Sequence, residues 1–239
     1  MGRGPSIEGR KNAEDSRRAK LFTKLIREIT VAARTGGGDP QANSRLRMGI
    51  DKALSSNMTK DTIERAIKRG AGEGGAEHFE EIRYEGYAPG GVAILVDCMT
   101  DNPTRTVAEV RHAFTKLGGH LGTSGSVSYL FERRGEIAID IRDNPILEEK
   151  VLETALYAGA DDVVSHNDFV EVVSTPENYE SVKQALSLAG HKMFRADISM
   201  RPATMVAVTG EPAVAVVKLI EWLEDLDDVQ KVFTNADLP

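Results

Sequence analysis

Arginine and lysine side chains recur at helical spacing along the first third of the chain. When residues 20–34 are placed on a helix at about 100° per residue, four cations share an arc of about 80°: Lys20, Lys24, Arg27 and Arg34. The apolar side chains of this stretch fill a separate arc of about 140°, which is typical of a buried helix face. Cations on one solvent stripe can neutralise the phosphates of a nucleic acid, so phosphate binding is the chemistry predicted here.

Two further segments repeat this pattern. Residues 44–54 have apolar side chains at i, i+4 and i+8 and cations on the other side. In residues 59–70, the hydroxyl of Thr59 is suited to cap a helix and Gly70 to end it. The three predicted helices form a basic module whose candidate nucleic-acid-binding residues are Lys20, Lys24, Arg27, Arg34, Arg45, Arg47, Lys52, Lys60, Arg65, Lys68 and Arg69.

The formal charge of the chain is strongly asymmetric. Residues 11–72 contain 14 Lys and Arg against 7 Asp and Glu, whereas residues 73–239 contain 14 against 29. A basic module on an acidic body is expected when one domain meets phosphates and the rest avoids them. A structural role stays open, in which the cations pair with acids of their own module: Glu28, Asp51, Asp61 and Glu64.

Charge reversal offers a direct prediction for this module. Arg27, Arg65 and Arg69 are all expected to be exposed. Reversing the three charges together should therefore abolish association with nucleic acid or the ribosome and leave the fold intact.

A second candidate site is the glycine-rich segment Gly122, Thr123, Ser124, Gly125 and Ser126. Its backbone amides are able to form a nest for an anion, but the Gly-Lys-Ser/Thr ending of a nucleotide-binding P-loop is missing. We expect either a turn that uses glycine at positive φ before a strand at residues 126–131, or a polar loop that contacts RNA or protein.

Other chemistries are poorly represented in the sequence. Cys98 is the only cysteine and lies in an apolar strand, so we expect a buried, inert thiol and no internal disulfide. The five histidines are scattered, without an HExxH or His-x-His pattern. Asn102, Arg105 and Arg111 are interpreted as helix-capping residues or, alternatively, as ligand contacts. We expect no metal, no cofactor and no enzymatic activity.

Beyond residue 72 the periodicity changes to strands and helices of an α+β protein. The order strand, helix, strand, strand, helix, strand over residues 136–200 is ferredoxin-like. The preceding hairpin, helix and strand are resumed only by residues 204–234, which indicates one α/β (ferredoxin-like) domain inserted into another. After a flexible linker at residues 71–75, this gives three predicted domains: residues 11–72 (helical), residues 78–132 plus 202–239 (α/β), and residues 133–201 (the insertion).

The apolar runs and the first residues of the chain indicate its cellular location. No apolar run reaches the roughly 20 residues that cross a bilayer, and the start lacks a secretory h-region, so a cytoplasmic location is expected. Residues 1–10 are interpreted as a remnant appended to the natural chain, because Ile7-Glu8-Gly9-Arg10 suits a processing protease; a natural basic start is the alternative. We expect a monomer.

Five sequence blocks resemble the signature blocks of the YebC/PmpR family. They are residues 24–34 (KLIREITVAAR), 36–40 (GGGDP), 57–70 (NMTKDTIERAIKRG), 84–87 (YEGY) and 118–126 (GGHLGTSGS). The resemblance extends from Lys11 onward, while residues 1–10 lack the His-Ser-Lys-Trp block with which relatives usually open. It implies a three-domain protein labelled a probable transcriptional regulator in bacteria. Mitochondrial relatives are described as translational activators, with a proposed role at the ribosome.

Three functions are consistent with these observations. The first is a translation factor that binds the ribosome or its RNA through the basic helices and the polar loop. The second is a DNA-binding transcriptional regulator, although Arg and Lys predominate on the helices and Asn or Gln base readers are not evident. The third, a small-molecule sensor, would require an apolar pocket with convergent polar groups.

Overall fold

The computed structural model describes residues 7–72 and 78–239. Three helices form the N-terminal region: α1 (Ile7–Gly36), α2 (Ser44–Ser55) and α3 (Lys60–Gly70). They enclose a core that contains Ile29, Leu46 and Ile63. Part of the predicted linker, residues 73–75, lies outside the described residues.

Local capping fixes these helices where the sequence predicts them. The side chain of Asn43 accepts a hydrogen bond from the Leu46 amide and donates to the Ala32 carbonyl oxygen, which joins the start of α2 to the end of α1. Thr59 caps α3 as predicted. The apolar faces are less completely buried than expected, because Leu21 is 47% exposed and Leu54 42% exposed.

The first α/β unit is built on a four-stranded antiparallel sheet. In sheet order its strands are β3 (His120–Leu121), β1 (Glu80–Ala88), β2 (Val92–Thr100) and β9 (Val229–Thr234). Helices α4 (Pro103–Lys116) and α7 (Gly210–Asp225) cover one face of this sheet, around Ile94, Val96, Phe114 and Leu219. Short strands β8 (Val206–Ala207) and β10 (Ala236–Asp237) pair with each other.

The second α/β unit has the ferredoxin-like order predicted for residues 136–200. Its sheet order is β5 (Asp162–Ser165), β6 (Phe169–Ser174), β4 (Phe131–Asp140) and β7 (Met193–Pro202). Helices α5 (Leu147–Tyr157) and α6 (Tyr179–Leu188) pack on one face, over a core that includes Ile137, Ile139, Val170 and Val172.

One predicted strand is wrong. Residues 126–131 do not form a strand, because Ser128–Leu130 adopt a short 3₁₀ helix and β4 begins at Phe131. The amides of Val127 and Ser128 donate to the carboxylate of Glu85, which lies 42 and 43 positions earlier in the chain, and are therefore not available to a neighbouring strand.

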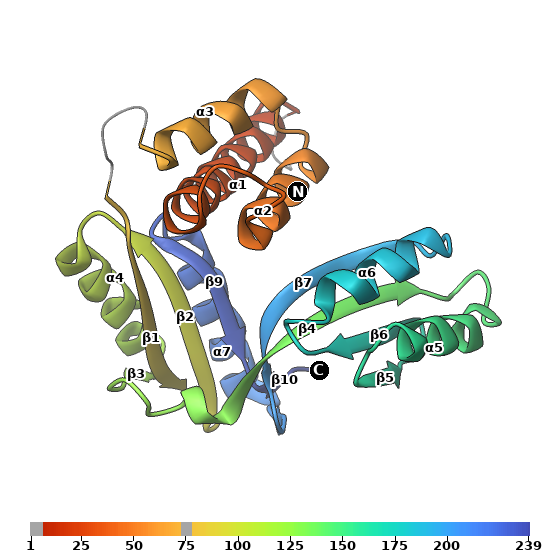
Figure 1. Ribbon diagram of the computed structural model, residues 1–239. Helices are drawn as coiled ribbons and strands as arrows, with labels where there is room; N and C mark the ends of the chain where they lie inside the picture. Colours follow the sequence, from red (N-terminus) through yellow and green to blue (C-terminus); the bar gives the residue numbers. More distant parts are fainter. Residues whose placement is uncertain (1–6, 73–77) are drawn as a thin grey trace.

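The chain leaves the first unit through β4 and returns from β7 to the elements that complete the first unit (Figure 1). This path agrees with the α+β class and the insertion expected from the sequence, whereas the boundaries given for the three domains stay predictions. The helical region lies over both α/β units (Figure 1), with α1 against α7 and α2 facing β7. Within the described residues, none of the helices is both long and apolar enough to span a membrane.

Candidate nucleic-acid interface

Three cations of the α1 stripe, Lys20, Lys24 and Arg27, face the C-terminal end of α7 and the segment that follows it. Lys20 Nζ lies 2.7 Å from Asp225 Oδ1, and Lys24 Nζ donates to the carbonyl oxygen of Glu224. The sequence of α7 ends in an acidic run that, by its charge, would repel phosphate. The fold uses this run as an internal counter-charge for α1.

Arg27 is largely enclosed, with a side chain only 16% exposed. Its guanidinium donates to Asp228 Oδ1 and to the carbonyl oxygens of Met99 and Asp227, each at 3.1 Å. The expectation that Arg27 is exposed is therefore wrong, because the guanidinium is drawn into a boundary between α1 and the first α/β unit. Reversing its charge would disturb this boundary, so Arg27 does not belong in a test of nucleic-acid binding.

Asp228 is the centre of a buried hydrogen-bond cluster. Its carboxylate also accepts from Arg105 at 3.0 Å and from the Thr106 hydroxyl at 2.8 Å, and the residue is 2% exposed. Burial alone would raise the pKa of Asp228, but the hydrogen bonds from Arg105, Thr106 and Arg27 outweigh burial and lower it. Asp228 therefore stays charged and ties α1 to α4.

The remaining α1 cation and the first α2 cation contact the start of the first sheet. Arg34 donates to the Phe79 carbonyl oxygen at 2.7 Å, although Arg34 itself is exposed. Arg45 forms a hydrogen bond with Glu28 at 2.9 Å and also pairs with Glu81. These contacts attach the helical region beside the linker.

Two α2 cations contact the second α/β unit. Arg47 pairs with Glu180 on α6 at 2.7 Å, and Lys52 pairs with Asp197 on β7 at 2.7 Å. Burial is the main cause that lowers the pKa of Lys52, with a further contribution from neighbouring Lys231. The predicted outward faces of α1 and α2 are thus largely engaged inside the molecule.

Helix α3 presents the cations with the fewest internal partners. Lys60, Arg65, Lys68 and Arg69 are all exposed. Arg65 has an ion pair of 3.4 Å with Asp61 within the same helix, and its side chain remains 68% exposed. In the described ranges, no ion pair or side-chain hydrogen bond involves Lys60, Lys68 or Arg69. Within the described residues, these four predicted cations are exposed and have no ion pair or side-chain hydrogen bond with another element, whereas Arg34 is exposed but donates to Phe79.

The glycine-rich loop does form a nest of amides, and a side chain of the protein fills it. The amides of Gly125, Val127 and Ser128 donate to the buried Glu85 carboxylate at 2.6 to 3.0 Å. Burial would raise the pKa of Glu85, but these backbone hydrogen bonds outweigh it and lower the pKa. Because Glu85 occupies the donors, a phosphate does not fit there; Thr123 and Ser124 remain exposed for polar contacts.

The other candidate residues have structural explanations. Cys98 is 3% exposed, and burial raises the pKa of its thiol to about 12, so the thiol is inert. Asn102 caps α4 by accepting from the Arg105 amide, while Arg111 is exposed. The described part of the chain holds no group of three or more His, Cys, Asp or Glu that could bind a metal ion.

Sequence reasoning missed the internal acids that receive the cations. Asp228, Glu180 and Asp197 lie more than 130 positions from their partners, so no local spacing connects them. The signal that could have found them is the charge asymmetry itself, since a basic module and an acidic body of one chain attract each other.

A three-helix region with exposed cations is joined to two α/β units, which defines the chain as an α+β protein. Residues 4–73 match the family described as TACO1/YebC protein N-terminal domain, and residues 79–236 match TACO1/YebC second and third domain. The chain belongs to the TACO1/YebC family. Since the match begins at residue 4, the interpretation of residues 1–10 as an appended remnant is not supported for residues 4–10.

Named relatives align along almost the whole chain. A probable transcriptional regulatory protein of Xanthomonas campestris pv. campestris is 56% identical over 99% of this chain and 98% of its own. One from Stenotrophomonas maltophilia is 55% identical over 100% of this chain and 98% of its own. The crystal structure of a conserved hypothetical protein, Aq1575 from Aquifex aeolicus, is similar with a TM-score of 0.84 and 49% identity, covering 94% of this chain and 92% of that one.

Proposed function

We propose that this protein regulates gene expression by binding nucleic acid, acting without catalysis, and that its target is the ribosome through ribosomal RNA. The contact surface is the α3 face, defined by Lys60, Arg65, Lys68 and Arg69, with the polar tip of Thr123 and Ser124 as a second contact. Regulation agrees with the names of the family relatives.

The exposure of the α3 face carries this proposal. Figure 1 shows α3 on the side of the helical region that faces away from both sheets, so a large partner can approach it. The predicted cations of α1 and α2 already contact carboxylates or carbonyl oxygens of the same chain. The α3 cations can therefore bind phosphate without first breaking a contact to another part of the molecule. Lys68 and Arg69 also lie in the last turn of α3, where the helix dipole interacts favourably with cations and so stabilises the helix that carries the contact surface.

RNA suits this surface better than sequence-specific DNA. Helix α3 carries no Asn or Gln to read base edges in a major groove. Shape and phosphate contacts without base readout are typical of the recognition of folded RNA. A DNA-binding transcriptional regulator is the alternative function, favoured by the names of the relatives.

Co-sedimentation with ribosomes, in the presence of competing duplex DNA and across a salt series, separates the two functions. We expect saturable ribosome binding that survives excess DNA at near-physiological salt and weakens as salt releases phosphate contacts. Tighter, sequence-dependent DNA binding without ribosome association would establish the alternative. Binding to neither partner would contradict nucleic-acid binding altogether.

A further inference from the structure

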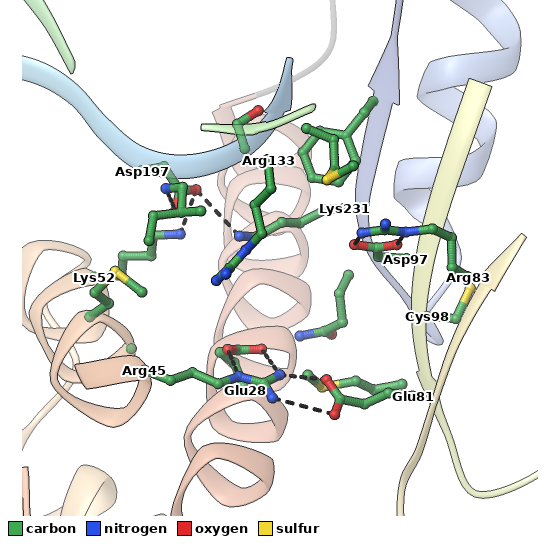
Figure 2. Close-up of a pocket in the computed structure, with 18 of the residues that line it drawn as sticks. Glu28, Arg45, Lys52, Glu81, Arg83, Asp97, Cys98, Arg133, Asp197 and Lys231 are labelled. Carbon is green, nitrogen blue, oxygen red and sulfur yellow. Dashed lines mark hydrogen bonds and ion pairs between the residues drawn. The ribbon is translucent and has the colours of Figure 1, made fainter. Parts of the chain in front are cut away.

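A cavity of about 450 Å³ lies where the three parts of the molecule meet, among α1, α2, the first sheet and β7 (Figure 2). Its size falls in the range of about 300–1,000 Å³ that is typical of small-molecule sites, which occur preferentially at domain boundaries. It is separate from the α3 face, because no α3 residue lines it.

The charged groups in the wall of this cavity are almost all paired with each other. Four acids receive four cations: Glu28 and Glu81 both pair with Arg45, Asp97 with Arg83, and Asp197 with both Lys52 and Lys231. The dashed lines in Figure 2 mark these pairs. Such a wall is close to neutral and offers little to a highly charged ligand.

Arg133 is the exception in the wall. Its guanidinium extends into the middle of the cavity (Figure 2), and within the described residues it has no ion pair or side-chain hydrogen bond. A guanidinium presents several donors in a planar fork that matches a carboxylate, sulfonate or phosphate group. The cavity therefore has one unpaired positive centre, at the end of β4 that enters the second α/β unit.

The remaining wall is apolar and adaptable. Met48, Met99 and Met200 come from α2, β2 and β7, and Phe233 comes from β9. Thioether side chains repack easily and make favourable contacts with aromatic rings. The ring of Phe233 can pack edge-to-face or stacked against a second aromatic ring. These side chains line the same cavity as the unpaired guanidinium and offer apolar surface that suits a flat ring.

We propose that this cavity binds a small organic anion with a flat aromatic body, whose single negative group pairs with Arg133 while its rings pack against the methionines and Phe233. The inference goes beyond nucleic-acid binding and does not depend on it. It supplies part of what a small-molecule sensor requires, namely apolar wall residues beside one unpaired polar group. Because all three parts of the molecule line the cavity, a bound ligand stabilises their docked arrangement.

Two fluorescent probes of nearly the same shape test the charge requirement. 8-Anilinonaphthalene-1-sulfonate has one negative group on an aromatic body, and N-phenyl-1-naphthylamine has the same rings without the charge. We expect the sulfonate to bind the full-length protein at one saturable site, at least tenfold more tightly than the neutral probe, and to raise its melting temperature.

Substitution of the unpaired cation locates the site. Arg133→Gln should weaken binding of the sulfonate about tenfold or more and leave binding of the neutral probe unchanged. Arg111→Gln, which removes another exposed arginine outside the cavity, should have no effect on either probe. Circular dichroism checks that both variants are folded.

Three results would overturn the inference: no saturable binding of the sulfonate, equal affinity for both probes, or equal loss in the two arginine variants. Equal affinity would mean that the probes adsorb to exposed apolar side chains such as Leu188 and Tyr157. The probe experiment uses no ribosomes, so its result does not affect the separate test of nucleic-acid binding.

Discussion

Arg27 Nη1 lies 3.1 Å from Oδ1 of Asp228, a residue 201 positions further along the chain. The pair joins α1 to the buried cluster at the end of α7, where Asp228 also accepts from Arg105 and Thr106. A cation that the sequence pattern assigns to a nucleic acid therefore holds two parts of the molecule together. The consequences of this arrangement, and of the exposed cations that remain, can be measured.

Removal of Arg27 should destabilise the docked arrangement. Arg27→Ala leaves Asp228 and the carbonyl oxygens of Met99 and Asp227 without one donor each, at a cost of about 1–3 kcal/mol of unfolding free energy. Urea unfolding followed by circular dichroism measures the change. Arg17→Ala, at an exposed position of the same helix, is the matched control and should change stability by less than about 0.5 kcal/mol; equal effects would contradict the contact.

Stability should fall at acidic pH through Asp228. Because the pKa of this carboxyl is lowered in the folded protein, its contribution is present above the unfolded value of about 3.9 and is lost as pH falls through the folded value. Unfolding free energies of the wild type and Asp228→Asn, measured from pH 6 to pH 2.5, should differ most at pH 6 and converge at the acid end. A constant difference across this range would show that the charge of Asp228 is not involved.

The loop at residues 122–128 should depend on Glu85. In Glu85→Gln one carboxylate oxygen becomes an amide NH₂ group, which cannot accept a hydrogen bond, so either the Gly125 amide or the Val127 and Ser128 amides lose their acceptor. We expect faster hydrogen exchange at these amides and a loss of about 1–3 kcal/mol in unfolding free energy. Glu132→Gln, at an exposed strand position, is the control, and unchanged exchange in both variants would refute the nest.

The two α2 cations should control how the helical region sits on the second α/β unit. In the double variant Arg47→Glu and Lys52→Glu, attraction to Glu180 and Asp197 becomes repulsion. Small-angle X-ray scattering should report a larger radius of gyration, while circular dichroism shows unchanged helix content. The exposed pair Lys60→Glu and Lys68→Glu reverses the same charge without a partner and should keep the radius of the wild type.

Much of the fold was accessible from local sequence signals. Thr59 and Asn102 cap helices where predicted, and the βαββαβ order of the second unit follows from alternating periodicities. The strand expected at residues 126–131 failed because the Glu85 carboxylate captures the amides of Val127 and Ser128, a contact that spans about 40 residues and leaves no periodic trace.

The sequence predicted only part of the candidate interface. Helical spacing correctly separates apolar from charged faces, so Ile29 is buried and Arg69 exposed. Spacing does not say what a charged face meets. Lys52 meets Asp197, which lies 145 positions away, and only the folded chain brings them together. Arg133 escaped notice for the same reason, since its isolation in a cavity depends on three parts of the molecule.

The measurement that tests the central claim most directly is ribosome co-sedimentation of an α3 variant, Arg65→Glu, Lys68→Glu and Arg69→Glu, beside a control of equal charge change. The control reverses Arg111, Lys116 and Lys218, which are exposed on the acidic α/β body. Our account predicts that the α3 variant stays folded but loses at least tenfold in ribosome affinity, with a shallower salt dependence, while the control binds nearly as the wild type does. Wild-type affinity in the folded α3 variant, or an equal loss in the control, would contradict it.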